Sequence, residues 1–223
     1  MAQHHTFTLN GGQVLSNVKV QLIFWGAHWQ KSPDTSKIEK AARKILSAEY
    51  LAGLTQYGVD ISGIALDKSV MEPTTPPKLF DDPADVVALV TRLITDGTAA
   101  PPDKTLYMVI MPPGIIAAST DLGGQQDDSG RHDSFHYKNT EVHYGWVLSG
   151  HPKEKTVPRV TIALSEEVVE AITDPEPPTG WISQVEEGDW EELADVCEGV
   201  NAKLSGGTLV RTYYSTAADD CFP

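Results

Sequence analysis

Long hydrophobic runs, cysteines and basic residues are all scarce in this 223-residue chain. No apolar run approaches the roughly 20 residues that a membrane-spanning helix needs, so we expect no transmembrane segment. Two cysteines are too few for a disulfide scaffold or a cysteine-rich zinc site. Lys and Arg number 17 against 31 Asp and Glu, a formal charge of −14. Because such a surface repels phosphate backbones and anionic lipid, we expect neither nucleic acid nor a membrane as a partner.

Other signatures are missing as well. No Gly-x-Ser-x-Gly elbow is present, which argues against a serine hydrolase. Residues 1–12 lack the basic and apolar segments of a secretory signal, and we expect them to be flexible. The sequence as written therefore predicts a cytoplasmic protein, or a secreted one if a leader was removed.

Hydrophobic patterning predicts one α/β domain over residues 1–223, with a mixed, twisted sheet and packed helices. Apolar runs at 18–25 and 106–111 are typical of strands buried on both faces. We expect one or two strands at 59–70, an edge or antiparallel strand at 142–148, helices at 38–50, 81–95, 158–172 and 190–197, and a long polar loop at 121–139.

The predicted helix at 158–172 carries an unusual set of carboxylates. Glu166 and Glu170 are one turn apart, Glu167 neighbours Glu170, and Asp174 lies near the next turn. The rest of this helix is largely apolar, so we expect it to be buried. Buried like charges are costly unless they are protonated, hydrogen-bonded or bound to a cation. A solvated acidic face is the simpler alternative.

Several motifs give a family resemblance. The segment Ser165-Glu-Glu-Val-Val-Glu-Ala-Ile-Thr-Asp-Pro175 is followed by Gly180-Trp181 and by Glu192-Leu-Ala-Asp-Val-Cys197. This order resembles uncharacterised zincin-like proteins with the pattern Ser-His-Glu-x-x-Glu-Ala-x-Thr-Asp-Pro and, more distantly, the EXORDIUM (phosphate-induced) proteins. The early Gly11–Asn17 and the late Tyr213-Tyr-Ser215 with Cys221 resemble the same group.

The resemblance implies a zincin-like active-site helix with specific roles. Glu166 and Glu170 would be metal ligands, and Glu167 would be the general base that activates water. Glu166, however, stands where the pattern has its first histidine. Two carboxylates without an imidazole favour calcium, manganese or magnesium over zinc, or no metal at all.

Histidines and a tryptophan elsewhere extend this candidate site. His136 follows an aromatic residue, as in the resembled group, and is predicted to be a metal ligand or a proton donor. His143 is a weaker candidate on the next strand, and Trp181 is expected to wall the substrate site with Asp174. His132 and His151 are interpreted as surface residues.

The two cysteines form a natural pair. Cys197 and Cys221 are the only two cysteines of the sequence, and both occupy cysteine positions of the resembled pattern, so we expect them to form a disulfide. Two reduced buried thiols are the alternative. A disulfide between them would close a loop and stabilise the folded protein by roughly 3 kcal/mol.

Three functions fit these residues. The first is a degenerate zincin-like enzyme that hydrolyses a peptide or a small amide or ester, assisted by zinc, calcium or manganese. The second is a non-catalytic binding protein for a peptide or small-molecule ligand. The third is a metal-free acid–base enzyme acting on a small molecule.

Overall fold

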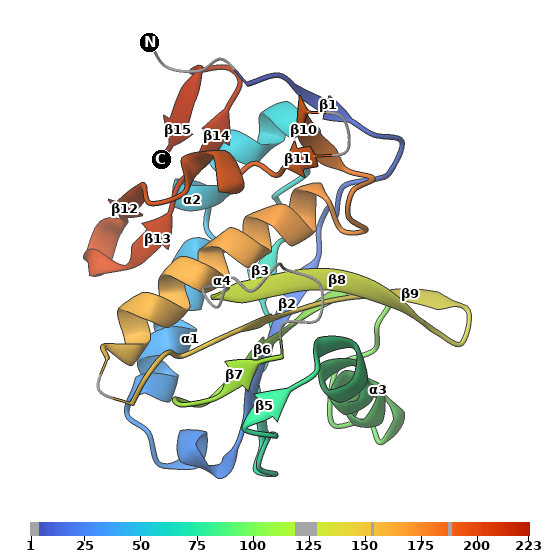
Figure 1. Ribbon diagram of the computed structural model, residues 1–223, viewed down its shortest axis with the longest axis vertical. Coiled ribbons are helices and arrows are strands. Elements are labelled where there is room, and N and C mark those ends of the chain that lie inside the picture. Colours follow the sequence, from blue (N-terminus) through green and yellow to red (C-terminus); the bar gives the residue numbers. More distant parts are fainter. Residues whose placement is uncertain (1–4, 119–128, 153, 187–188) are drawn as a thin grey trace.

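A six-stranded mixed sheet lies at the centre of the molecule (Figure 1). The computed structural model describes residues 5–118, 129–152, 154–186 and 189–223. Most sheet neighbours run parallel, and one edge strand is antiparallel to its neighbour. Across the sheet the strands are β3 (Ala65–Leu66), β2 (Lys19–Trp25), β6 (Thr105–Ile110), β9 (Thr140–Val147) and β8 (Gly130–Tyr137), with β4 (Val70–Glu72) also pairing with β2.

Helices cover both faces of this sheet, as the apolar strands predicted. On one face, α3 (Val87–Thr95) follows the helical turn Asp82–Val86 and packs its buried leucines and valine against the sheet. On the other face lie α1 (Asp34–Ile45) and α4 (Thr156–Thr173), whose apolar side chains share a core with β2 and β6. The prediction of a single mixed α/β domain is confirmed.

Short C-terminal strands form an outer layer against α4, on the side away from the sheet (Figure 1). The buried Tyr213 and Tyr214 join this layer to the α4 core. Because protein lies on both sides of α4, several of its polar side chains are buried, among them Ser165, Glu167 and Glu170. The outer elements are β1 (Phe7–Leu9), β10 (Trp181–Glu186), β11 (Asp189–Glu191), β12 (Asn201–Lys203), β13 (Leu209–Arg211), β14 (Tyr213–Ser215), β15 (Asp220–Phe222) and the short helices Asp195–Cys197 and Ser205–Gly207.

Smaller elements complete the chain, and they include the short α2 (Ala48–Leu51), the helical turns Ala27–Gln30 and Ala52–Tyr57, and the strand pair β5 (Leu79–Phe80) and β7 (Ile116–Ala117). None of the described helices combines the length and the apolarity needed to cross a membrane.

The disulfide prediction is confirmed. Cys197 and Cys221 are bonded, at a sequence separation of 24. The bond joins the short helix Asp195–Cys197 to β15, and so links two elements of the outer layer covalently.

Four sequence predictions differ from the structure. Residues 130–137 of the expected loop form β8, and residues 121–128 lie outside the described residues. Because β8 takes the edge, β9 is an interior strand, so of the two alternatives expected for 142–148 the edge position is wrong and the antiparallel pairing, with β8, is confirmed. Residues 190–197 contain the end of β11 and a short 3-10 helix instead of one α-helix. Residues 7–9, in the segment expected to be flexible, pair with β10, and residues 1–4 are not described.

Candidate functional site

Helix α4 is the backbone of the site. Pro158 lies in its first turn, where a missing N–H costs nothing. The helix ends at Thr173, and Asp174 accepts a 2.6 Å hydrogen bond from the Gly180 amide. A Cβ at Gly180 would lie 2.3 Å from the Asp174 Cα, so only glycine permits this close return of the chain.

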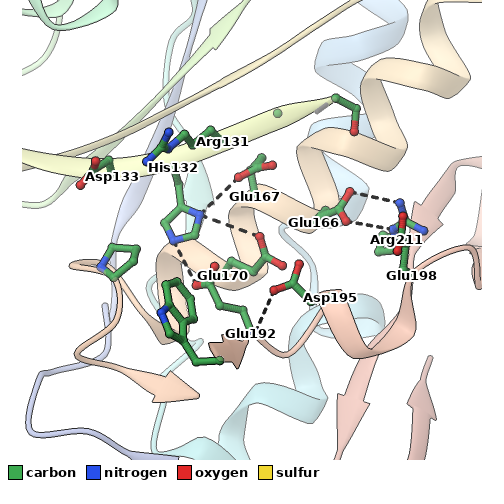
Figure 2. A pocket seen from close by; sticks show the side chains of 14 residues that line it. Arg131, His132, Asp133, Glu166, Glu167, Glu170, Glu192, Asp195, Glu198 and Arg211 are labelled. Carbon is green, nitrogen blue, oxygen red and sulfur yellow. Dashed lines mark hydrogen bonds and ion pairs between the residues drawn. The ribbon is translucent and has the colours of Figure 1, made fainter. Parts of the chain in front are cut away.

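A cavity of about 510 Å³ opens between α4, the start of β8 and the outer layer (Figure 2). Its described lining is mostly charged, and acids outnumber bases. The lining residues are Ser129, Gly130, Arg131, His132, Asp133, Glu166, Glu167, Glu170, Pro177, Trp190, Glu192, Asp195, Glu198 and Arg211.

His132 is at the centre of this charged cluster. Its Nδ1 lies 3.2 Å from Glu167 Oε2 and 3.9 Å from Glu170 Oε2. On the other side of the ring, Nε2 lies 3.2 Å from Glu192 Oε1 and 3.1 Å from the Asp174 carbonyl oxygen. Figure 2 shows the imidazole reaching from β8 between the glutamates of α4 and Glu192. A carbonyl oxygen only accepts, so Nε2 is the donor and Nδ1 faces the two α4 carboxylates.

A glycine allows strand and helix to come this close. A Cβ at Gly130 would lie 2.5 Å from Glu167 Oε1. Real Cβ atoms do not approach that closely, so a larger residue would displace either the strand or the Glu167 carboxylate. Gly130 therefore belongs to the site through its lack of a side chain.

Burial shifts the pKa of every group in this cluster. It raises the pKa of Glu167 to about 8, although His132 opposes the shift. Burial, followed by the nearby charge of Glu192, raises the pKa of Glu170 well above its usual range. Burial also raises the pKa of Glu192, again opposed by His132. Burial lowers the pKa of His132, but the charges and hydrogen bonds of Glu192 and Glu167 outweigh it and raise that pKa well above normal.

The cluster has more acceptors than donors. Glu170 is 4% exposed, and its Oε1 has no hydrogen-bond partner among the described residues. His132 Nδ1 and one oxygen each of Glu167 and Glu170 all lie within 4.8 Å of one another. Such a spacing of an imidazole nitrogen and two carboxylate oxygens suits a divalent cation.

Glu166 points to a different partner. Its Oε1 lies 3.2 Å from Arg211 Nε, and its Oε2 accepts a 3.4 Å hydrogen bond from Arg211 Nη2. Burial raises the pKa of Glu166, and Arg211 opposes that shift. The geometry therefore pairs Glu166 with an arginine, and the role of metal ligand that the resemblance implied for Glu166 stays a prediction.

The two histidines predicted for the site are not part of the cavity lining. His136 is on the same face of β8 as His132, but it lies about 13 Å farther along the strand. Helix α4 ends before that point, and the His136 side chain is 81% exposed beside Glu141. His143 lies 3.9 Å from Glu176, beyond the end of α4, and burial lowers its pKa. The expectation that His132 is a surface residue is wrong for the same reason: it is the histidine that α4 covers.

Asp174 and Trp181 also differ from their expected positions. Asp174 is buried and holds the Gly180 amide and the His132 ring, so it positions other groups instead of lining the cavity. The Trp181 indole donates to the Tyr57 carbonyl and stacks edge-on against Tyr57, since the pleat of β10 turns it toward the core. Among the described residues, the aromatic side chain that lines the cavity is Trp190, which is 36% exposed.

Four ionisable site residues were missed by sequence reasoning: His132, Glu192, Asp195 and Arg211. Glu192 and Asp195 belong to the Glu-x-x-Asp-x-Cys element that carried the resemblance, and this could have suggested them. His132 could have been found by interpreting 130–137 as the first strand of a hairpin. Nothing in the sequence marks Arg211 as a partner of Glu166, because 45 residues separate them.

A scan against models of known protein families and a search of curated proteins gave no match to this chain.

Proposed function

We propose that the chain is an enzyme that hydrolyses a peptide, or a small amide or ester, with a divalent cation held by His132, Glu167 and Glu170. The observation that carries this proposal is the convergence of these three buried ligand atoms within 4.8 Å beside the cavity. Carboxylate oxygens alone would favour a hard cation. The imidazole nitrogen of His132 moves the preference toward zinc or manganese.

The surroundings of the ligands fit this assignment. Because Nε2 of His132 donates to the Asp174 carbonyl, with Glu192 at 3.2 Å, Nδ1 is the nitrogen directed at Glu167 and Glu170, and its lone pair would be available to a cation that displaces the Nδ1 proton. Carboxylate and carbonyl partners of this kind fix the ring orientation of metal-binding histidines. Oε1 of Glu170, which none of the residues that the structure describes hydrogen-bonds, supplies a further acceptor that a cation would satisfy.

The remaining residues suggest how water would be used. A bound divalent cation lowers the pKa of water and polarises a carbonyl group. An Asp195 carboxylate oxygen lies within 4.8 Å of one from Glu170, and Asp195 faces the same cavity, so it is placed to accept a proton. Trp190 and Pro177 give the cavity an apolar wall for a substrate side chain.

The arrangement of helix and strand agrees with the family resemblance. In zincins an edge strand runs beside the active-site helix, and here β8 runs beside α4. We therefore retain a zincin-like relationship as part of the proposal. The disulfide adds that the protein functions in an oxidising compartment, because such bonds are rare in the cytosol.

Metal analysis and calorimetry test this proposal. Protein purified without chelator is expected to bind one equivalent of Zn²⁺ or Mn²⁺. Glu170→Gln should weaken binding by at least about 100-fold, more than the loss typical of an outer-shell partner. Glu141→Gln, the same change beside the exposed His136, should leave binding unchanged. Wild-type protein that binds neither ion, with no thermal shift, would overturn the metal assignment.

A second candidate function is metal-free acid–base catalysis. His132 lies 3.2 Å from both Glu167 and Glu192, so an imidazole connects two carboxylates across the cavity wall. Such pairs can donate and accept protons in one reaction. Hydrolytic or isomerase activity that persists in EDTA but is lost in Glu167→Gln would favour this candidate. A binding protein without catalysis would show ligand binding and no activity in either condition.

A further inference from the structure

We propose that the cavity contains two adjoining cation positions that share Glu170, and that Arg211 excludes a metal ion from the second one. The first position is the His132, Glu167 and Glu170 set of the proposed function, on which this inference rests. The second is formed by Glu166, Glu170 and Asp195, each with one carboxylate oxygen within 4.8 Å of the others. Glu170 is more than nine-tenths buried and has an oxygen with no hydrogen-bond partner in the described part of the chain, so it can serve either position.

The second position has the chemistry of a hard-cation site. Its three groups are all carboxylates, which are the preferred ligands of Mg²⁺, Ca²⁺ and Mn²⁺. In two-metal sites the ions lie roughly 3.5–4 Å apart, a separation that a shared carboxylate can span. On charge and spacing alone, this set could therefore hold a second ion.

Arg211 removes one of these three ligands. Both oxygens of Glu166 are engaged by the guanidinium, at 3.2 Å and 3.4 Å. Figure 2 shows the Glu166 carboxylate turned toward Arg211. The pair is largely buried, with side chains 13% and 12% exposed, so water screens it little. A fixed positive charge next to Glu166 also repels any cation that approaches the other two carboxylates.

The backbone keeps Arg211 in this place. Its amide donates a 2.8 Å hydrogen bond to Ser165 Oγ, and its carbonyl accepts a 2.7 Å hydrogen bond from the Tyr50 hydroxyl. Ser165 is the residue before Glu166 on α4, so the helix that carries the carboxylate also holds the strand that carries its partner. These contacts do not involve the guanidinium, and β13 should keep its position when the side chain is changed.

Manganese titration with electron paramagnetic resonance tests the inference. Wild-type protein should bind one Mn²⁺ and give the six-line spectrum of an isolated ion. Arg211→Met should bind two and give the broadened spectrum of two coupled ions. Arg211→Lys retains the charge and should bind one, and the double variant Glu166→Gln/Arg211→Met should return to one. Arg159→Met, which removes an arginine on the same helix as Glu166, should match the wild type.

The outcomes separate this inference from the proposed function. If wild type and Arg211→Met each bind one ion, the proposed function stands and the exclusion by Arg211 is overturned. If wild type binds none and Arg211→Met binds one, the exclusion is supported and the His132 position fails. Two ions in the wild type, or none in either protein, would also overturn the inference. Arg211→Gln, with hydrogen-bonding capacity but no charge, repeats the test if the methionine variant does not fold, and it too should bind two ions.

Discussion

The two faces of the central sheet differ in how their buried carboxylates are paired with basic residues. On the α3 face, the two buried carboxylates Glu72 and Asp82 each have an arginine within reach, at 2.6 Å for Arg92 and 4.0 Å for Arg131. On the α4 face, four buried or half-buried glutamates surround one histidine and one arginine.

This difference separates a structural role from a functional one. The close Glu72–Arg92 pair neutralises itself and leaves no attraction for a ligand, whereas Asp82 is only loosely paired and keeps one oxygen without a partner among the described residues. Unmatched acids raise one another's pKa and provide acceptors that an added cation can satisfy. The excess of acids over bases, more than the number of acids, therefore distinguishes the α4 face as the candidate site.

The largest expected effect on stability belongs to the α3 face. Leu93 is 1% exposed and packs in the core between α3 and the sheet. Leu93→Ala should lower the free energy of unfolding by about 2–5 kcal/mol, because it leaves a cavity among apolar side chains. Urea denaturation measures this loss. Manganese affinity, measured below the melting temperature, should stay within twofold of wild type, and a larger change would show that the two faces are coupled.

An intermediate effect is expected from pH, and it should come from the α4 face. In EDTA, Glu167 keeps its proton up to about pH 8 in the folded protein but loses it near its ordinary value of 4.5 when unfolded. Between these values the folded state binds more protons, so stability falls as pH rises. His132, whose pKa is also raised, changes stability in the same direction above its unfolded value of 6.5.

The melting temperature in EDTA should therefore drop between pH 6 and pH 8, by about 2–4 °C for each kcal/mol lost. Glu167→Gln should flatten this slope, while Glu141→Gln should retain it. Added Mn²⁺ should stabilise the protein more at pH 8 than at pH 6, because deprotonated ligands bind metal better. A melting temperature that rises with pH in EDTA would contradict the raised pKa of Glu167.

The smallest effect is expected from the exposed end of β8. His136→Ala removes a side chain that is 81% exposed and should change stability by less than about 0.5 kcal/mol. Metal binding should not change. His132→Ala, the same substitution on the same face of the strand, should abolish binding at the first cation position. Equal losses in the two variants would argue that the hairpin as a whole, and not the histidine under α4, determines binding.

The sequence was most informative where a pattern is repeated over many residues. The apolar runs at 18–25 and 106–111 predicted β2 and β6, and the helical spacing at 158–172 predicted α4 together with its glutamates. It was least informative for β8. That strand is polar because it lies at the edge of the sheet and faces the cavity, and a polar segment next to glycines is also typical of a loop.

The choice of histidine shows why the site could not be completed from the sequence. His132 and His136 are four residues apart, so on a strand both side chains point to the same face, and nothing in the neighbouring sequence distinguishes one from the other. Only the point where α4 ends distinguishes them, and that depends on how helix and strand are placed in space. The pairing of Glu166 with Arg211 has the same origin, since a contact across 45 residues leaves no local pattern.

The chain's own order of residues determined the α/β class and the acidic helix with its apolar faces, because periodicity acts locally, and its two cysteines left one possible intrachain pair, whose oxidation the structure shows. Tertiary packing decided which histidine joins the carboxylates, which glutamate is neutralised and which tryptophan faces the cavity. The physical reason is that a carboxylate's chemistry depends on every charge and donor within a few ångströms, and most of those neighbours come from distant parts of the chain.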